Sequence, residues 1–408
     1  MTRIQIISTG VGNTELLTQA AAQAIANSAV LIGDKRLLSP YQGGDKKLFA
    51  ATRAQEILGI IANCTPTERI GVLVSGDVGF YSLAKSMLAA LDEPAELHCG
   101  IGSLQYFAAK LQTPWQDICL LSLHGRDTQL LSKLKTHSKV FLLTGGTHNV
   151  SGICRYLSQH GFGDIQAAVG ERLSYPDECI TRGSVQELQH QEFASLSVLM
   201  LFNTNADSNR QVTHGLADEC FARGRAPMTK QEVRAVSLSK LELRQADVFY
   251  DIGAGTGSVS IEAALLLNDG YVYALERDSE SVELIHTNAR KFCLENIQII
   301  ESYAPEGLAD LPAPDKAFIG GSGGKLAAIL DAIYAKNKAC RIVLNCIALE
   351  SLSACLEYYK DKKDYELEIV NISVAKAKKV ASYNMMMGTN PIYIVTASRI
   401  DKAGDAHE

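Results

Sequence analysis

Short apolar runs alternate with longer amphipathic runs along the first half of the chain. Residues 4–8, 70–75 and 197–202 are rich in isoleucine, valine and leucine, whereas stretches between them, such as 17–28, are rich in alanine. Apolar runs of this length between turns predict buried strands, and alanine-rich stretches favour helices. Their alternation predicts an α/β fold in which helices cover a mostly parallel sheet.

The same alternation starts again after residue 247. Its apolar runs predict seven strands, the last of them antiparallel and at the edge of the sheet, as in a nucleotide-binding α/β fold. The strands are expected at 248–250, 272–275, 297–300, 316–319, 342–345, 367–371 and 392–396.

A polar segment separates the two halves. Residues 203–209 contain asparagine, threonine, aspartate and serine, with a single alanine, and such residues favour turns and loops. A chain of 408 residues is also too long for one ordinary core. We therefore expect a first domain over 1–204, a linker over 205–214 and a second domain over 215–408.

The most informative motif follows the first strand of the second domain. It reads Asp251-Ile-Gly-Ala-Gly-Thr-Gly257, between an apolar run and an amphipathic run, so it predicts a strand, a glycine turn and a helix. Glycine at 253, 255 and 257 permits positive φ and leaves no Cβ atom to hold a ligand away. Glu276 ends the next apolar run, near the offset at which an acidic residue binds ribose hydroxyls.

The spacing of these glycines distinguishes two classes of nucleoside ligand. A dinucleotide site uses G-x-G-x-x-G, in which a later glycine makes room at the pyrophosphate, but the motif here is G-x-G-x-G and residue 258 is serine. Asp251 would repel a pyrophosphate, whereas it suits the ammonium group of S-adenosylmethionine, directly or through water. The motif favours S-adenosylmethionine; the alternative is a glycine turn without any ligand.

Composition narrows the class further. The chain is 47% hydrophobic and 21% charged with a net charge of −6, which argues against general nucleic-acid binding because that needs a basic face. It has no apolar run long enough to span a bilayer, and its first residues carry no signal-peptide pattern. The ten cysteines are scattered without metal-site spacing, so we expect buried thiols, no metal and a cytoplasmic location.

Both halves resemble known families. Residues 1–202 resemble the tetrapyrrole methylases of cobalamin biosynthesis, and residues 215–398 resemble the decarboxylating corrinoid methyltransferases. In the first half the similar segments are Ser75-Gly-Asp-Val-Gly-Phe-Tyr-Ser82, Gly100-Ile-Gly-Ser-Leu-Gln105, Ser122-Leu-His-Gly-Arg126 and Glu171-Arg-Leu-Ser-Tyr-Pro-Asp-Glu178. In the second half they are Leu216-Ala-Asp-Glu-Cys-Phe221, Met228-Thr-Lys-Gln-Glu-Val-Arg-Ala235, Asp251 to Ser258, Ser302-Tyr-Ala-Pro-Glu306 and Ile319-Gly-Gly-Ser-Gly-Gly324.

The resemblance implies a two-lobed tetrapyrrole methylase fold followed by a Rossmann-like methyltransferase fold, each with an S-adenosylmethionine site. It implies an enzyme, assembled as a homo-oligomer, that methylates a precorrin or cobalt-precorrin at meso carbons 5 and 15. It also implies loss of carbon dioxide from the ring C acetate. The segment Ile319-Gly-Gly-Ser322 lacks the Asp/Asn-Pro-Pro-Tyr motif of amine methylation, which agrees with carbon as the nucleophile.

The resemblance also assigns roles to residues. In the second domain it implies that the three glycines form the backbone turn at the cofactor and that Glu276 binds the ribose. It also implies that Ala304 and Pro305 lie beside adenine. Substrate carboxylates would bind cations, for which the candidates are Lys230, Arg234 and Lys325. In the first domain it implies cofactor binding by Gly10, Gly12, Gly76, Asp77, Gly102, Ser103 and Thr144. His124 and Arg126 are candidates for contact with the substrate.

The first domain departs from its family at two turns. The usual G-x-G-P-G is replaced by Gly10-Val-Gly12-Asn-Thr, and Val78 stands in place of the usual proline after Gly76-Asp77. Proline would preset these turns, so its loss weakens preorganisation. This leaves an alternative in which only the second domain is active and the first is a scaffold. A nicotinamide-dependent oxidoreductase and a nucleic-acid methyltransferase are two further alternatives.

Overall fold

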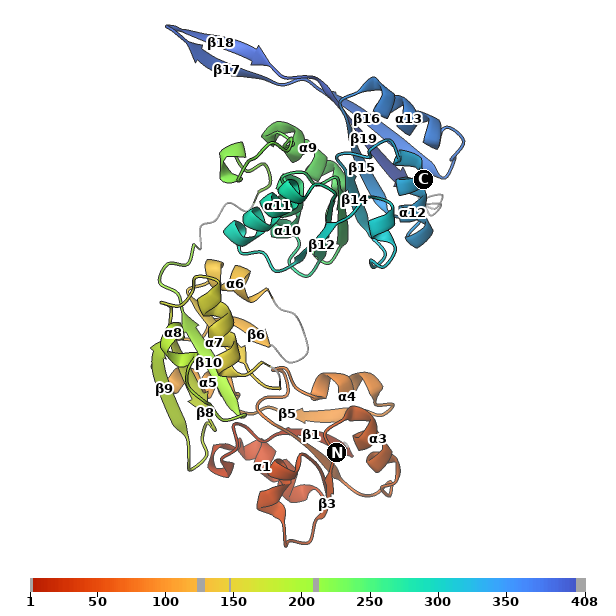
Figure 1. The fold of residues 1–408 in the computed structure, drawn as a ribbon. Coiled ribbons are helices and arrows are strands. Elements are labelled where there is room, and N and C mark those ends of the chain that lie inside the picture. Colours follow the sequence, from red (N-terminus) through yellow and green to blue (C-terminus); the bar gives the residue numbers. More distant parts are fainter. Residues whose placement is uncertain (1–2, 123–128, 147, 208–212, 401–408) are drawn as a thin grey trace. The chain divides into compact units, whose positions relative to one another are not determined.

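The structure is a computed structural model that describes residues 3–122, 129–146, 148–207 and 213–400. The chain divides into two compact units, residues 1–208 and 209–408, and each is an α/β structure with its own sheets (Figure 1). Residues 208–212 of the expected linker lie outside the described residues. The α/β fold class expected for both halves is confirmed.

The first sheet of the N-terminal unit has five parallel strands in the order β3-β2-β4-β1-β5. Its elements are β1 (Ile4–Ser8), α1 (Gln19–Asn27), β2 (Val30–Gly33), α2 (Lys35–Leu38), β3 (Lys47–Ala50), α3 (Ala54–Ala62), β4 (Ile70–Val74), α4 (Ala84–Ala90) and β5 (Ala95–His98). Helices α3 and α4 cover one face of the sheet, whereas α1 and α2 cover the other. Coverage of both faces explains why β1, β2 and β4 are apolar throughout.

The second sheet of this unit corrects the expectation of a mostly parallel arrangement. Its elements are α5 (Ser103–Lys110), β6 (Cys119–Ser122), α6 (Leu130–Thr136), β7 (Lys139–Leu143), α7 (Val150–Gln159), β8 (Gln166–Glu171), β9 (Cys179–Ser184), α8 (Val185–Leu188) and β10 (Ser197–Phe202). The order is β6-β7-β10-β8-β9. Of its four pairs of neighbouring strands, only β6 with β7 is parallel. A short turn, too short for a crossover helix, joins β8 to β9, so the two strands must be antiparallel.

The C-terminal unit contains a seven-stranded sheet in the order β13-β12-β11-β14-β15-β19-β16. Its elements are α9 (Gln231–Leu241), β11 (Val248–Ile252), α10 (Ser258–Leu266), β12 (Tyr271–Glu276), α11 (Ser279–Phe292), β13 (Ile297–Glu301), β14 (Lys316–Ile319), α12 (Leu326–Lys336), β15 (Arg341–Cys346), α13 (Leu349–Tyr359), β16 (Tyr365–Ile372), β17 (Ala375–Val380), β18 (Tyr383–Gly388) and β19 (Ile392–Arg399). The seven predicted strands are all present. The last strand is antiparallel as predicted, but it lies between β15 and β16, so β16 forms the edge.

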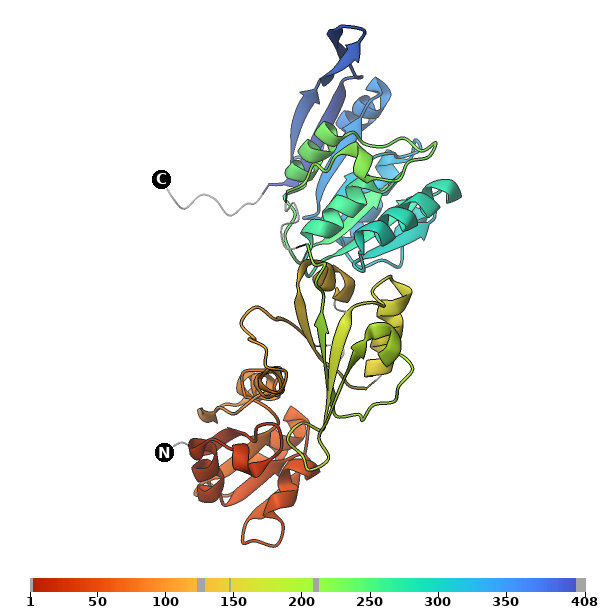
Figure 2. The ribbon, with the colours of Figure 1, turned by 90° about the vertical axis from the view of Figure 1, so that its left-hand side faces the viewer.

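Helices cover both faces of this sheet, as Figures 1 and 2 show. On one face Phe249 of β11 packs with residues of α9 and α10, while the next residue, Tyr250, packs on the other face with residues of α12. Successive strand residues point to opposite faces, so a strand that packs helices on both sides must be apolar at every position. The resulting core fixes the ends of the central strands, from which the loops of the site begin.

A hairpin of β17 and β18 projects from the sheet of the C-terminal unit (Figure 1). All twelve of its strand residues are exposed, including Tyr383, Met385, Met386 and Met387. A two-stranded hairpin is marginally stable alone in water. The hairpin was not among the predicted strands, because β18 carries three methionines in a row without alternation and neither strand has a buried face.

The cysteines correct part of the sequence expectation. All ten are free, but only Cys154, Cys340, Cys346 and Cys355 are buried, whereas Cys99 and Cys179 are exposed. Burial raises the pKa of the Cys154 thiol to about 12, so this thiol is inert at neutral pH. The described residues hold no group of side chains arranged to bind a metal, and none of their helices is long and apolar enough to cross a membrane.

Candidate active site

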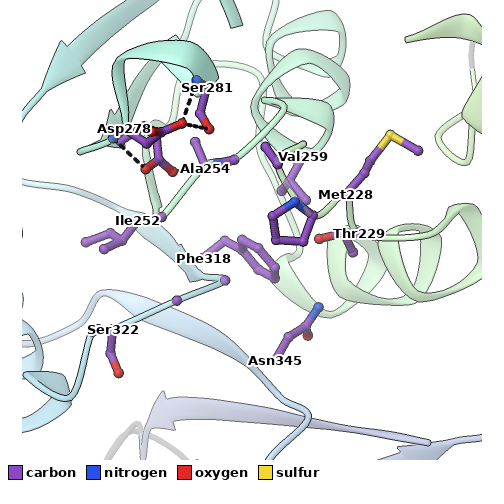
Figure 3. Close-up of a pocket in the computed structure, with 18 of the residues that line it drawn as sticks. Met228, Thr229, Ile252, Ala254, Val259, Asp278, Ser281, Phe318, Ser322 and Asn345 are labelled. Atoms are coloured by element: carbon purple, nitrogen blue, oxygen red, sulfur yellow. Dashed lines mark hydrogen bonds between the residues drawn. The ribbon is translucent and has the colours of Figure 1, made fainter. Parts of the chain in front are cut away.

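A cavity of about 1140 Å³ opens at the carboxyl ends of the parallel strands in the C-terminal unit. Its walls come from the loops after β11, β12, β13, β14 and β15 and from the segments before α9 and β19. Figure 3 shows Ile252, Ala254, Phe318 and Asn345 among the side chains around it. Open α/β sheets bind ligands at this edge, because strand ends and helix starts converge there.

The loop between β11 and α10 cannot accept side chains at its glycines. Gly253 has φ +71°, and a Cβ atom there would lie 2.8 Å from the carbonyl oxygen of Gly321. Gly257 has φ +75°, and a Cβ atom there would lie 2.9 Å from a methyl group of Ile285. Only glycine combines such φ values with such close approach. The bare backbone of Gly253 and Gly255 therefore forms part of the cavity wall.

The amide groups of this loop are already used inside the protein. The N–H groups of Gly253 and Ala254 both donate to the carbonyl of Leu275, and that of Gly257 donates to the carbonyl of Ala254. The Gly255 N–H donates to Glu276. A phosphate-binding loop presents such groups to its ligand instead, so this geometry disfavours a dinucleotide.

The Glu276 carboxylate lines the cavity in a fixed orientation. It accepts hydrogen bonds from the N–H groups of Gly255 at 2.8 Å, Arg277 at 2.8 Å and Asp278 at 3.1 Å. A carboxylate has about four acceptor positions, so Glu276 can still accept from a ligand hydroxyl. Asp278 in turn caps α11 through the N–H and hydroxyl of Ser281, as Figure 3 shows.

Asp251 lies beneath the loop. It is 1% exposed and is not among the residues that line the cavity, so of the two expected contacts with a ligand amine this position fits the one through water. One carboxylate oxygen accepts from the Ser260 hydroxyl, and the other has no hydrogen-bond partner in the structure. Burial, with a smaller contribution from the charge of Glu276, raises the pKa of Asp251 to about 7.

The residues after β13 contribute an aromatic wall. Ala304 lines the cavity, and Pro305, joined to it by a cis peptide bond, does not. The adjacent Tyr303 is exposed and lies between two cations, with its ring centre 5.6 Å from the Arg277 guanidinium and 5.9 Å from the Lys325 ammonium. Sequence reasoning missed Tyr303 and Arg277; the available signal was their position next to Ala304 and Glu276.

The three proposed carboxylate-binding cations have different surroundings. Arg234 is fully buried: its guanidinium pairs with Glu262 at 2.6 Å and with Asp218 at 3.3 Å. This corrects its assignment as a substrate clamp. Lys230 lines the cavity with its side chain half exposed, and Lys325 lines it while paired with the exposed Glu306 at 2.6 Å. The i, i+4 spacing does place Lys230 and Arg234 on one side, since both pair with Asp218, but only Lys230 reaches the cavity because Arg234 is buried.

Several predicted residues of the N-terminal unit lie together. Gly10 and Gly76 form a β-bridge, and Asp77 accepts from the N–H of Gly100 at 2.9 Å. A Cβ atom on Gly102 would lie 4.0 Å from that of Asp77, and Ser103 begins α5 directly after it. The loops after β1, β4 and β5 are therefore packed against one another.

The other predicted residues of this unit are Gly12 in the loop after β1, Thr144 after β7, and His124 and Arg126. Gly12 has φ +123°, and the Tyr175 ring lies so close that a Cβ atom would come within 2.4 Å of it. Thr144 follows β7, where its buried hydroxyl donates to the carbonyl of Ser197 at 2.7 Å. His124 and Arg126 lie outside the described residues.

Comparisons with known proteins match both halves. Residues 3–189 match the family model of tetrapyrrole (corrin/porphyrin) methylases, and residues 219–399 match that of the precorrin methyltransferase domain. A probable cobalt-precorrin-6B C(15)-methyltransferase (decarboxylating) of Pyrobaculum calidifontis is 43% identical over 45% of this chain and 96% of its own length. A precorrin-6Y C(5,15)-methyltransferase (decarboxylating) of Sinorhizobium is 27% identical over 96% of this chain and 95% of its own.

A solved structure is also similar. The crystal structure of a precorrin-6Y C5,15-methyltransferase from Geobacter metallireducens covers 47% of this chain and 100% of its own, with 45% identity and a TM-score of 0.44. The two family matches confirm the resemblances found in the sequence. The chain belongs to the precorrin methyltransferase family, with a tetrapyrrole methylase domain ahead of its precorrin methyltransferase domain.

Proposed function

We propose that the protein methylates a precorrin or cobalt-precorrin at meso carbons 5 and 15 and decarboxylates its ring C acetate, as a step of cobalamin biosynthesis. The alignment with the Sinorhizobium enzyme over 96% of the chain supports both halves of this reaction. The observation that carries the proposal is the bond from the Gly255 N–H to Glu276, since it builds a ribose acceptor into a loop that does not cradle phosphate.

We propose S-adenosylmethionine as the cofactor of the C-terminal unit. Gly253 and Gly255 supply a wall without side chains, Glu276 is oriented to accept from ribose hydroxyls, and Ala304 lies where adenine is expected. Asp251 would act on the methionine amine only through water. When bound, S-adenosylmethionine supplies an electrophilic methyl group on a sulfonium.

The cavity suits methyl transfer to carbon. A meso carbon of a reduced tetrapyrrole is electron-rich and needs little help from a base, so positioning and exclusion of water carry most of the catalysis. Phe318 and Val259 give the cavity apolar walls. The glycines at 320, 321, 323 and 324 leave room beside the strand end for a broad flat substrate.

The remaining cations of the cavity are assigned to substrate carboxylates. Lys230 is half exposed at the cavity, and Lys325 needs only to exchange its exposed partner Glu306. The ring C acetate should instead meet no tight ion pair, because an ion pair would stabilise the carboxylate that has to be lost.

A second S-adenosylmethionine site is proposed for the N-terminal unit. Packing of the loops that carry Gly10, Gly76, Asp77 and Gly102 supports it, since these loops converge at the carboxyl ends of three parallel strands. Gly12 would contribute to this site beside Tyr175. We assign methylation of one meso carbon to each unit.

We also propose that the protein is a cytoplasmic homo-oligomer. Its ten free cysteines agree with a reducing compartment. The exposed Tyr383 and Met386 of the β17–β18 hairpin are apolar surface that a second copy would cover.

Product mass tests the reaction. The full chain is incubated with labelled S-adenosylmethionine and either precorrin-6B or its cobalt form. Two added methyl groups with loss of carbon dioxide are expected. One methyl group with decarboxylation would assign the N-terminal unit a scaffold role, and no transfer to either substrate would exclude the proposed function.

A further inference from the structure

The cavity is larger than a nucleoside needs. Its volume of about 1140 Å³ exceeds the usual range for a single drug-sized ligand. The residues suited to the nucleoside are Gly255 after β11, Glu276 at the end of β12 and Ala304 after β13. The remaining walls, after β14 and β15 and before β19, are free for a second ligand; we call them the β15 side.

Charge divides the cavity in the same way. The acidic residues that line it are Glu276, Asp278 and Glu280, all in one segment after β12. The same segment also holds Arg277, whereas the β15 side and the segment before α9 contribute Arg225, Lys230 and Lys325 and no acidic lining residue. Lys230 pairs with Asp218 at 3.9 Å and Lys325 with Glu306 at 2.6 Å, so a ligand carboxylate would exchange with these partners. A ligand on the β15 side therefore meets positive charge at its edge, which complements carboxylates.

The β15 side also exposes apolar side chains. Ile347, which lines the cavity directly after β15, is 64% exposed, and Leu349, at the start of α13, is 66% exposed. The register of β15 with β19 pairs Cys346 with Tyr393, so Ile347 lies at the strand end beside the segment before β19. That segment continues the wall with Thr389 and Asn390.

Single exposed aliphatic side chains are common. Here Ile347 lines the cavity and Leu349 follows it by two residues outside the lining, so a ligand that extends past the cavity rim could cover both. Such a ligand needs an apolar face and negative charges at its edge. A tetrapyrrole macrocycle with acetate and propionate side chains has both features.

We propose that Ile347 and Leu349 form the platform on which the macrocycle lies, while Lys230 and Lys325 bind carboxylates at its edge. This inference rests on the proposed function for the identity of the macrocycle. Ile347 and Leu349 are then determinants of substrate binding and take no part in holding S-adenosylmethionine, which occupies the other side of the cavity.

The test compares two variants of the full chain. In Ile347→Ser/Leu349→Ser the apolar platform is removed. The control Leu356→Ser changes a 42% exposed side chain of the same helix α13, seven positions after Leu349 and further from the lining residue Ile347 along the chain. Binding of cobalt-precorrin-6B is followed by its absorbance in the presence of S-adenosylhomocysteine, so no turnover is needed.

The double variant should bind cobalt-precorrin-6B about tenfold or more weakly, as loss of two apolar contacts predicts. Its affinity for S-adenosylmethionine, measured by calorimetry, should equal that of wild type, and Leu356→Ser should change neither affinity. Unchanged binding of cobalt-precorrin-6B by the double variant would overturn the inference.

A second measurement separates the other possible occupant. Sedimentation should give the same mass for wild type and the double variant; a lower mass for the double variant would assign the two residues to an interface between copies and overturn the inference. Turnover of the wild type is assayed separately. Weaker binding by the double variant, together with no turnover by the wild type, would support the platform and reject the proposed reaction. Wild-type turnover that the double change leaves unaltered would support the proposed reaction and reject the platform.

Discussion

The N–H of Gly255 donates to the carboxylate of Glu276 across 2.8 Å, so the glycine loop after β11 and the acid that ends β12 form one hydrogen-bonded unit. The bond fixes the carboxylate before any ligand arrives. It also occupies a loop amide that a phosphate-binding loop would present to its ligand. This hydrogen bond therefore favours a ligand with ribose hydroxyls over one with a pyrophosphate at this loop.

Glu276→Gln should weaken S-adenosylmethionine binding to the C-terminal unit. The glutamine amide keeps the size of the side chain. Its carbonyl oxygen can still accept from Arg277 and Asp278, but its NH₂ group cannot accept from the Gly255 N–H. We expect a loss of about tenfold to a hundredfold, as for an unsatisfied hydrogen bond in a site. Calorimetry on the full chain measures it, with the exposed Glu350→Gln as control. An unchanged affinity would remove Glu276 from the site.

Gly253→Ala should destabilise the C-terminal unit and abolish its cofactor binding. The added methyl group would lie 2.8 Å from a backbone oxygen, on a residue with φ +71°. Strain of this kind costs about 1–3 kcal/mol. The matched control is Gly59→Ala, since a Cβ atom there meets nothing within 4 Å and α3 should gain stability. Urea unfolding compares the two, and equal stability would contradict the prediction.

Arg234→Met should destabilise the fold and should not act as loss of a substrate contact. The change leaves Glu262 buried without its guanidinium, and removal of one partner of a buried ion pair costs about 3–5 kcal/mol. Arg234→Lys should fail to restore stability, because one ammonium cannot replace contacts to Glu262, Asp218 and the Thr229 carbonyl. A stable variant with a raised KM for tetrapyrrole would return Arg234 to the substrate site.

Asp251 should make stability depend on pH. Burial raises its pKa in the folded protein to about 7, above the ordinary value of 3.8. Between these values the folded state holds a proton that the unfolded state has lost, so the contribution is fully present below about pH 4 and is lost as pH rises through 7. In Asp251→Asn this slope, roughly 1 kcal/mol per pH unit, should disappear. Urea unfolding at several pH values measures it; parallel curves for both proteins would contradict the assignment.

The β17–β18 hairpin should carry self-association. The triple change Tyr383→Ser/Met385→Ser/Met386→Ser removes exposed apolar surface and alters none of the buried core residues. We expect a lower mass in sedimentation and an unchanged circular dichroism spectrum. Changing the exposed Leu88 of α4 to serine is the control, since that side chain lies in the other unit. An unaltered mass in the hairpin variant would place the interface elsewhere.

Features that depend only on neighbouring residues could be predicted from the sequence. Strand and helix alternation gave the α/β class, because apolar runs between turns become buried strands in almost any context. The glycines at 253, 255 and 257 predicted a turn with positive φ, which the structure has, since positive φ is a property of single residues. These predictions needed no knowledge of what lies across the molecule.

Features that join distant segments depend on how the chain packs and could not be read from local patterns. The second sheet is mostly antiparallel because β10 inserts between β7 and β8, and no local pattern encodes that pairing. Arg234 is buried because Asp218 and Glu262, 16 and 28 positions away, surround its guanidinium. Ile347 reaches the cavity only because β15 ends beside β14. Local sequence sets backbone conformation, whereas burial and the shape of a cavity depend on which segments the core brings together.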